Sequence, residues 1–254
     1  MEHDKIQKEG NVDYSKKNNL TVPVAIVIAG ALIAGAVYFS SGKSNLPTLA
    51  GDAIRKQQPS QGNTTSLDQM ASISTSDHLR GNPDAPVKIV EYSDLECPFC
   101  KRFHETMQQV MDEYGKSGKV AWVYRHFPLD QLHSKARNEA AATECANELG
   151  GNDKYWSYLD RLFEITPSNN NLDPAELSKI AQYIGLDIQK FNACLSSGKY
   201  AKHIEDDVQN AQATGGNGTP WSIIVAKNGK KYPLSGAQPY EAVKQLIELA
   251  LQEK

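Results

Sequence analysis

Two cysteines stand where an apolar run gives way to a helical pattern, and this unit constrains the fold more than any other feature of the chain. Residues 87–92 form a compact apolar run, which is typical of a strand buried on both faces. A helix is predicted to begin at Cys97, with Pro98 at its first position, and to end near Gly115. Residues 119–127 predict a second strand. A helical crossover between two strands favours a parallel pair, and therefore an α/β fold.

The remainder of the chain predicts a helical region followed by a hairpin and a closing helix. We therefore expect an α/β domain over residues 81–254, with a helical insertion at about residues 130–214. Gly and Asn in the KNGK segment predict the hairpin turn. The other predicted elements are helices over residues 132–149, 153–165, 187–197 and 200–213, a further helix after the capping residues Asp173, Pro174 and Glu176, strands over residues 221–226 and 231–234, and an amphipathic helix over residues 240–252.

Residues 20–39 contain no charged side chain in 20 positions. As a helix rising about 1.5 Å per residue, this run spans roughly 30 Å, the thickness of the hydrocarbon core of a bilayer. The apolar region of a signal peptide is shorter, usually about 7 to 15 residues. A buried core helix is the alternative, but the run is apolar on every face and adjoins a polar tail. We expect an uncleaved transmembrane anchor, with residues 1–19 as a cytoplasmic tail and residues 40–80 as a flexible polar linker.

Composition and charge exclude several classes of protein. The chain is 40% hydrophobic and 22% charged, which excludes a disordered or collagen-like chain. Its 27 Lys and Arg against 30 Asp and Glu give a net charge of -3, so no long-range attraction draws it to nucleic acid, and we expect no nucleic-acid partner. Four cysteines are too few for a disulfide scaffold, so their spacing carries the information.

Cys97 and Cys100 are placed for thiol chemistry. At the first turn of a helix the backbone N–H groups have no intrahelical partners and stabilise a thiolate, which lowers the pKa of Cys97. Cys97 is then the exposed attacking sulfur, and Cys100, one turn further in and more buried, resolves the mixed disulfide. The alternative is half of a zinc site. Zinc needs a second close pair of ligands, whereas Cys145 and Cys194 are far apart in sequence and no histidine is spaced to replace them, so we expect no metal and no cofactor.

The segments VKIVEYSDLECPFC, VYRHFPL, FNACL and GNGTP follow one another in an order that resembles the DsbA-like family of thiol:disulfide oxidoreductases. The resemblance covers residues 81–254 and implies a thioredoxin-like fold with a helical insertion. It implies that Pro220, preceded by Thr219, is the cis-proline that faces the active-site cysteines and binds substrate main chain, the alternative being an ordinary trans proline in a turn. It also implies a structural disulfide between Cys145 and Cys194, the alternative being two buried free thiols.

Glu91 lies six residues before Cys97 on the predicted buried strand. In thioredoxin-like proteins an acidic residue at this offset lies beneath the second cysteine, so the resemblance implies that Glu91 relays protons for Cys100. Burial would raise its pKa into a range useful for exchanging protons with thiols. The alternative is a glutamate that extends its carboxylate to solvent or forms an ion pair, with Lys88 or Arg125 as the candidate partners. Three further polar residues near the motif are expected to be solvated: Asp94, Glu96 and His104.

Three functions remain open. The resemblance implies an enzyme that donates the Cys97–Cys100 disulfide to thiol-containing proteins outside the cytoplasm and is recharged by a membrane redox partner. A disulfide reductase or isomerase would use the same pair in the other direction, and a non-enzymatic, membrane-anchored binding domain would not use it at all. The linker carries no oligomerisation domain, which favours the oxidase, whereas Phe99 weakens that choice because the strongest oxidases place histidine between the cysteines. A structural disulfide requires an oxidising compartment, so we expect a periplasmic or cell-surface domain anchored through residues 20–39.

Overall fold

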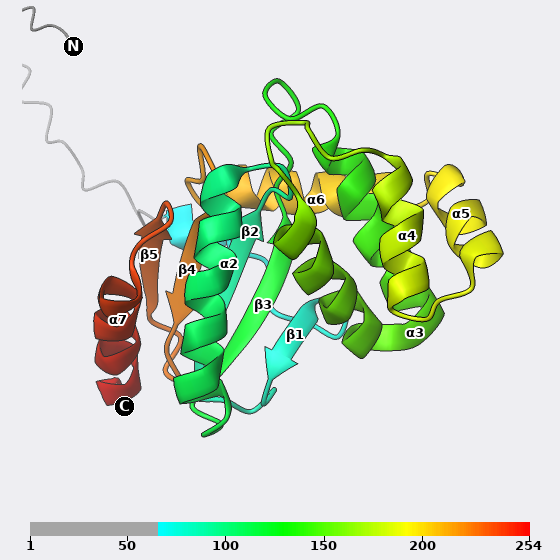
Figure 1. The fold of residues 1–254 in the computed structure, drawn as a ribbon. Helices are drawn as coiled ribbons and strands as arrows, with labels where there is room; N and C mark the ends of the chain where they lie inside the picture. Colours follow the sequence, from blue (N-terminus) through cyan, green and yellow to red (C-terminus); the bar gives the residue numbers. More distant parts are fainter. Residues whose placement is uncertain (1–65) are drawn as a thin grey trace, which may run out of the picture. The chain divides into compact units, whose positions relative to one another are not determined.

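A mixed β-sheet forms the centre of the molecule in the computed structural model, which describes residues 66–254 (Figure 1). Within these residues the sheet has five strands in the order β1-β3-β2-β4-β5. β2 and β3 are parallel, as predicted, and the other neighbouring strands are antiparallel. The strands are β1 (His78–Gly81), β2 (Val87–Ser93), β3 (Val120–His126), β4 (Trp221–Val225) and β5 (Lys231–Ser235).

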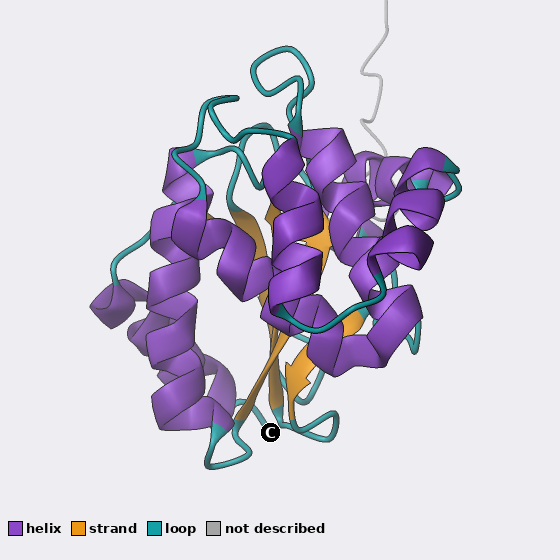
Figure 2. Cartoon of the chain, turned by 45° about the vertical axis from the view of Figure 1, so that its right-hand side comes forward, coloured by secondary structure: helices purple, strands orange, loops and turns teal. Residues whose placement is uncertain are grey.

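Helices cover both faces of this sheet, and Figure 2 shows the strands running between them. On one face lie α2 (Pro98–Val110), which continues into a π-helical turn, η2 (Met111–Gly115), and α7 (Tyr240–Gln252). On the other face lies α6 (Ala201–Ala213), which contacts β2 and β3. Side chains alternate along a strand, so Ile89 of β2 joins the core under α2 and α7, while Val90 joins the core under α6.

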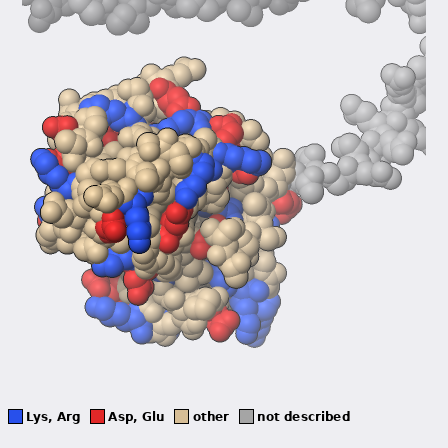
Figure 3. Space-filling view, turned by 90° about the vertical axis from the view of Figure 1, so that its right-hand side faces the viewer, with Lys and Arg blue, Asp and Glu red and all other residues tan. Residues whose placement is uncertain are grey.

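Of the helical insertion predicted over about residues 130–214, three helices pack on one another at one end of the sheet: α3 (Ala136–Ile165), α4 (Ala175–Tyr183) and α5 (Ile188–Ser196) (Figure 1). The last helix of the predicted insertion is α6, which covers a face of the sheet instead. Two predicted helices are joined in α3, which bends at Gly151, where φ is 75°. Glycine tolerates this left-handed conformation because it has no Cβ. The face of the molecule seen from this end carries acidic and basic side chains interspersed with one another (Figure 3).

Residues 66–80, predicted as the last part of the linker, are packed on the domain. A 3-10 turn, η1 (Ser66–Gln69), contacts α6, and β1 pairs with β3 at the edge of the sheet. Arg125 holds the intervening segment, because its Nε donates to Asp77 Oδ1 at 2.7 Å and its Nη1 donates to the Ala71 carbonyl at 3.2 Å. The folded domain therefore includes residues before Gly81. The segment has no regular apolar pattern in the sequence, but its scattered apolar side chains pack against the core under α6: Leu67, Met70, Ile73 and Leu79.

The predicted cytoplasmic tail (residues 1–19), the transmembrane anchor (residues 20–39) and residues 40–65 of the linker lie outside the described residues. Among residues 66–254, no helix combines the length and the apolar character that crossing a bilayer requires.

Candidate active site

Cys97 and Cys100 lie where β2 delivers the chain to α2. Cys97 is the N-cap of α2, with an extended backbone, and Pro98 occupies the first position of the helix, as predicted. Both cysteines carry free thiols. Cys97 is less exposed than expected, with 4% of its surface accessible, and Cys100 is completely buried. The carbonyl oxygen of Thr219 covers part of Cys97, 3.6 Å from its Sγ.

The surroundings of the two sulfurs drive their pKa values in opposite directions. The pKa of Cys97 is lowered to about 6, chiefly because the Cys100 thiol donates a hydrogen bond to it, with the backbone N–H groups of Phe99 and Cys100 adding to the effect. Burial raises the pKa of Cys100 well above its usual value. The site therefore stabilises a thiolate on Cys97 and a thiol on Cys100. The N–H groups at the helix start lower the pKa of Cys97, as predicted, but the hydrogen bond from Cys100 lowers it most.

This contact gives a test of the thiolate. We expect alkylation of the reduced full-length chain to follow a titration with its midpoint near pH 6, because Cys97 is ionised above that pH. Cys100→Ala removes the thiol donor and should move the midpoint upward, whereas Cys100→Ser keeps a donor and should move it less. Iodoacetamide labelling, with the modified peptide identified by mass spectrometry, measures the midpoint. A wild-type midpoint near pH 9 would contradict the assignment.

A second segment faces the cysteines from the start of β4. The peptide bond between Thr219 and Pro220 is cis, as the resemblance implied. Because Pro220 directly precedes β4, and Trp221 of β4 is paired with Tyr92 of β2, the sheet holds this loop beside the end of β2. The carbonyl of Thr219 thus meets the sulfur of Cys97, although the two residues are 122 positions apart.

Glu91 is completely buried on β2, on the same side of the strand as Ile89. Its Oε2 accepts a hydrogen bond from Trp122 Nε1 at 2.9 Å, and its Oε1 has no hydrogen-bond partner among the described residues. Burial raises its pKa to about 7. Neither cation of the alternative pairs with it, because Lys88 donates to the Ala85 carbonyl and Arg125 pairs with Asp77. The negative charge of Glu91 repels a thiolate on Cys100 and so raises the pKa of Cys100 further.

Two thiols at a helix start, beside a cis-proline loop that leads into the neighbouring strand of a mixed sheet, form the arrangement that the resemblance implied. The family model described as Thioredoxin matches residues 73–249. The chain belongs to the thioredoxin family.

Solved structures of DsbA proteins resemble this thioredoxin-family chain. It is similar to DsbA2 of Pseudomonas aeruginosa, with 28% identity and a TM-score of 0.59, over 72% of this chain and 100% of that one. It is also similar in fold to α-DsbA1 of Wolbachia pipientis, with 24% identity and a TM-score of 0.63, over 74% of this chain and 96% of that one. The likeness to DsbA2 supports a DsbA-like member of the thioredoxin family, and the likeness to α-DsbA1 shows the shared fold.

A third relative has a different kind of name. The chain is 34% identical over 158 residues to a protein named Na(+)/H(+) antiporter NhaA 1 of Mycolicibacterium gilvum, a match that covers 61% of this chain. The chain spans about a quarter of the length of such relatives, 24% in this case. The likeness is therefore to part of a longer protein.

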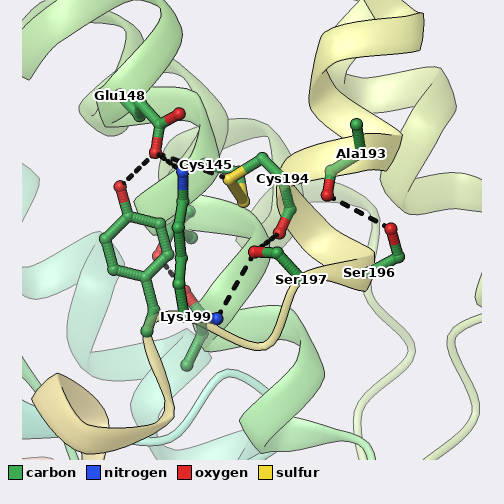
Figure 4. The surroundings of a disulfide bond; sticks show 10 residues. Cys145, Glu148, Ala193, Cys194, Ser196, Ser197 and Lys199 are labelled. Atoms are coloured by element: carbon green, nitrogen blue, oxygen red, sulfur yellow. Dashed lines mark hydrogen bonds and ion pairs between the residues drawn. A yellow bond between two sulfur atoms is a disulfide. The ribbon is translucent and has the colours of Figure 1, made fainter.

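The helical insertion of this thioredoxin-family chain contains the disulfide that the resemblance implied. Cys145 of α3 is bonded to Cys194 of α5, with 5.8 Å between their Cα atoms (Figure 4). Close by, Glu148 forms an ion pair with Lys199 and accepts a hydrogen bond from Tyr200 at 2.7 Å. The bridge fastens α5 to α3, and it leaves neither sulfur available to complete a zinc site with Cys97 and Cys100.

Asp94 was expected to be solvated and is instead buried, because it joins the turn before Cys97 to the loop after β3. Its Oδ1 accepts the N–H of Glu96 at 2.8 Å, and its Oδ2 accepts the N–H of Leu129 at 2.7 Å and lies 2.8 Å from His133 Nδ1. The bond to Glu96 is that of an Asx turn, a local signal that could have identified this residue. The other two partners come from the loop after β3 and left no local signal.

Glu96 and His104, also expected to be solvated, are buried too. Glu96 Oε2 accepts the N–H of Asn170 at 2.6 Å, which ties a loop of the helical insertion to the residue before Cys97. The pKa of the nearby Glu139 is raised to about 9, chiefly by burial and then by the carboxyl group of Glu96. His104 Nε2 lies 2.8 Å from Asp160 Oδ1. In each case the covering group belongs to a distant segment, so the sequence around the motif could not reveal the burial.

Proposed function

We propose that the chain is a thiol:disulfide oxidoreductase that donates the Cys97–Cys100 disulfide to thiol-containing proteins outside the cytoplasm. The observation that carries the proposal is the opposed acidity of the two sulfurs, with Cys97 stabilised as a thiolate and Cys100 as a thiol. An extended backbone of a substrate can pair with the edge formed by Thr219 and Pro220, beside Cys97. A reacting thiol of that substrate would then lie next to the Cys97 sulfur.

The proposed reaction has two exchanges. In the first, a substrate thiolate attacks the Cys97 sulfur of the oxidised pair, forming a mixed disulfide and releasing Cys100 as a thiolate. Cys100 takes up a proton, for which Glu91 is the nearby donor, because its pKa of about 7 leaves much of it protonated at neutral pH. In the second exchange, another thiolate of the substrate attacks the substrate sulfur of the mixed disulfide. Cys97 leaves as a thiolate, the substrate is oxidised by two electrons, and the enzyme is reduced by two.

The acidity of Cys97 supports donation as the direction. A cysteine of low pKa is a good leaving group in thiol–disulfide exchange. It also stabilises the reduced form of the pair, which makes the oxidised form a stronger oxidant. The reduced pair must be oxidised again after each turnover, and we propose that a membrane redox partner does so. The Cys145–Cys194 disulfide supports a location outside the cytoplasm, because such bonds persist in oxidising compartments.

A redox titration tests the direction. Equilibrium of the full-length chain with reduced and oxidised glutathione, followed by alkylation of free thiols, should give a potential nearer about -120 mV than about -270 mV, the values of strong thiol oxidants and reductants. An assay with reduced, unfolded ribonuclease should then show disulfide formation by the oxidised chain. A potential near the lower value would favour the reductase. Recovery of scrambled ribonuclease without net oxidation would favour the isomerase.

Glu91→Gln tests the proton relay. Below pH 7 the protonated Glu91 supplies a proton to Cys100, so we expect the wild type to react about 100-fold faster than the variant at pH 6, at the lower end of what a positioned proton donor contributes. Above pH 7 the carboxylate has no proton to give, and the ratio of the two rates should approach one. The measurement is the rate of oxidation of a reduced protein by each oxidised enzyme from pH 5 to 9. A ratio that does not change with pH would contradict the relay.

The stability of the same variant provides its control. The folded-state pKa of Glu91 lies above its unfolded value of 4.5, at about 7. Below pH 4.5 the ionisation of Glu91 therefore contributes no difference in the free energy of unfolding between the wild type and the variant. As the pH rises from 4.5 through 7, the wild type should lose about 3 kcal/mol of stability relative to the variant, at 1.36 kcal/mol per pH unit. The amide oxygen of the substituted side chain can still accept from Trp122, so the fold should be kept. Urea unfolding at pH 4 and pH 8 measures the difference.

A further inference from the structure

Three histidines surround one buried carboxylate where β1, β3, α3 and α6 meet. Glu144 Oε1 lies 2.8 Å from His78 Nε2, 2.9 Å from His126 Nε2 and 3.6 Å from His203 Nε2. Glu144, His78 and His126 are buried, and His203 is partly exposed. The proposed disulfide exchange uses none of these four residues.

Three of the four groups are spaced to bind one ion together. One ligand atom from each of His78, Glu144 and His203, a ring nitrogen or a carboxylate oxygen, lies within 4.8 Å of the other two. Zinc binds histidine nitrogen and carboxylate oxygen at about 2.0 to 2.2 Å, which in tetrahedral geometry places neighbouring ligand atoms roughly 3.3 to 3.6 Å apart. Small movements of the side chains are enough to reach this spacing. We propose that His78, Glu144 and His203 bind a divalent transition-metal ion of the Zn²⁺ class.

The surroundings orient these groups as ligands. The ring of Tyr155 stacks on His78, with 3.5 Å between ring centroids and an angle of 13° between the planes. The Nε2 of His126 lies within hydrogen-bond distance of Glu144 Oε1 and can donate to that oxygen. Contacts of this kind from outside the ligand set hold ligand side chains in place and tune their affinity for metal. The partial exposure of His203, whose side chain is 36% accessible, gives an ion a path from solvent and leaves room for a water as the fourth ligand.

The donor set selects the class of ion. Two imidazoles and one carboxylate suit Zn²⁺ and its transition-metal neighbours, whereas Mg²⁺ and Ca²⁺ prefer oxygen ligands throughout.

The position of the three ligands suggests what a bound ion does to the domain. His78 opens β1, Glu144 belongs to the helical insertion and His203 belongs to α6, so the ion would clamp the first strand of the domain to both helices. Binding to the folded state alone raises its stability with ion concentration.

The test uses the full-length chain in mild detergent, stripped of metal by a chelator and oxidised at Cys97–Cys100 so that those thiols cannot bind the ion. Isothermal titration with Zn²⁺ should show one equivalent bound, and Zn²⁺ should raise the temperature of thermal unfolding. Co²⁺ should give visible d–d absorption without thiolate-to-cobalt charge transfer. Mg²⁺ should have no effect on unfolding.

Two substitutions on α6 form the matched pair. His203→Gln removes one ligand and should weaken Zn²⁺ binding by at least about tenfold, the loss that even an outer partner of a ligand produces. Lys202→Gln, a change at the exposed neighbour that pairs with Asp206, should leave binding unchanged. Glu144→Gln should also lose binding. The proposal is overturned if the wild type shows no stoichiometric binding, or if His203→Gln and Glu144→Gln bind Zn²⁺ as tightly as the wild type.

Discussion

Replacing Cys97 with serine is expected to reduce disulfide transfer to the uncatalysed rate. A serine hydroxyl forms no disulfide, and the only other free thiol among the described residues, Cys100, is completely buried with its pKa raised well above the usual value. The oxidation of reduced, unfolded ribonuclease by the full-length chain measures the loss. The disulfide between Cys145 and Cys194 should remain in the variant, because it lies in the helical insertion. A non-enzymatic binding domain would instead show no disulfide transfer in the wild type, and its binding would survive this substitution.

Cys100→Ser provides the complementary result. Its Cys97 thiolate can still attack a disulfide of another protein, but no second thiol is present to release the product. We expect the variant to accumulate a covalent one-to-one adduct through Cys97, which non-reducing electrophoresis and peptide mapping detect. The double variant Cys97→Ser, Cys100→Ser should form no adduct. An adduct that maps to any other residue, or full activity in Cys97→Ser, would reject the proposed exchange.

Loss of the Cys145–Cys194 bridge is expected to have the largest effect on stability. The two residues are separated by 49 positions, and the chain-entropy model gives about 4 kcal/mol for closing a loop of that size, as an upper estimate. Both side chains are buried, so the Cys145→Ala, Cys194→Ala variant also loses packing between α3 and α5. We expect loss of the bridge to lower the free energy of unfolding by up to about 4 kcal/mol, with the lost packing adding to this and the greatest loss of hydrogen-exchange protection in α5.

A background of Cys97→Ala, Cys100→Ala isolates this bridge. In that background a reductant acts on Cys145 and Cys194 alone among the described cysteines, so urea unfolding with and without the reductant measures the bridge without any change in packing. The variant that lacks both bridged cysteines should be insensitive to the reductant. If reduction leaves the free energy of unfolding unchanged, the bridge does not stabilise the domain.

Local sequence patterns predicted most of the elements. Proline at the first position of a helix placed the start of α2, and the compact apolar run of residues 87–92 identified β2 as a strand buried on both faces. The predicted and observed limits of α7 agree at residues 240–252. The pattern did not show that residues 66–80 join the domain, because the groups that hold them lie elsewhere in the sequence. Arg125 binds the side chain of Asp77 and the carbonyl of Ala71, and the backbone of β1 pairs with β3.

The histidine cluster shows why longer-range features escape a reading of the sequence. His78 and His203 are 125 positions apart, and each by itself is an ordinary polar residue on a strand or a helix. Only the pairing of β1 with β3, together with the packing of α3 and α6 near the same end of the sheet, brings both rings to Glu144. Spacing between ligands in the sequence, which is the signal for many zinc sites, is absent here.

By itself, the sequence determined that a cysteine pair would begin a helix after a buried strand, because helix starts and buried strands are specified by residues within a few positions of one another. The tertiary structure alone decided how acidic each sulfur is and which polar groups are buried. Cys97 meets the carbonyl of Thr219, Glu91 lies in the core against Trp122, and Asp94 is bonded to the loop after β3. Burial and electrostatic interaction are sums over everything that packs around a group, and most of those neighbours come from distant parts of the chain.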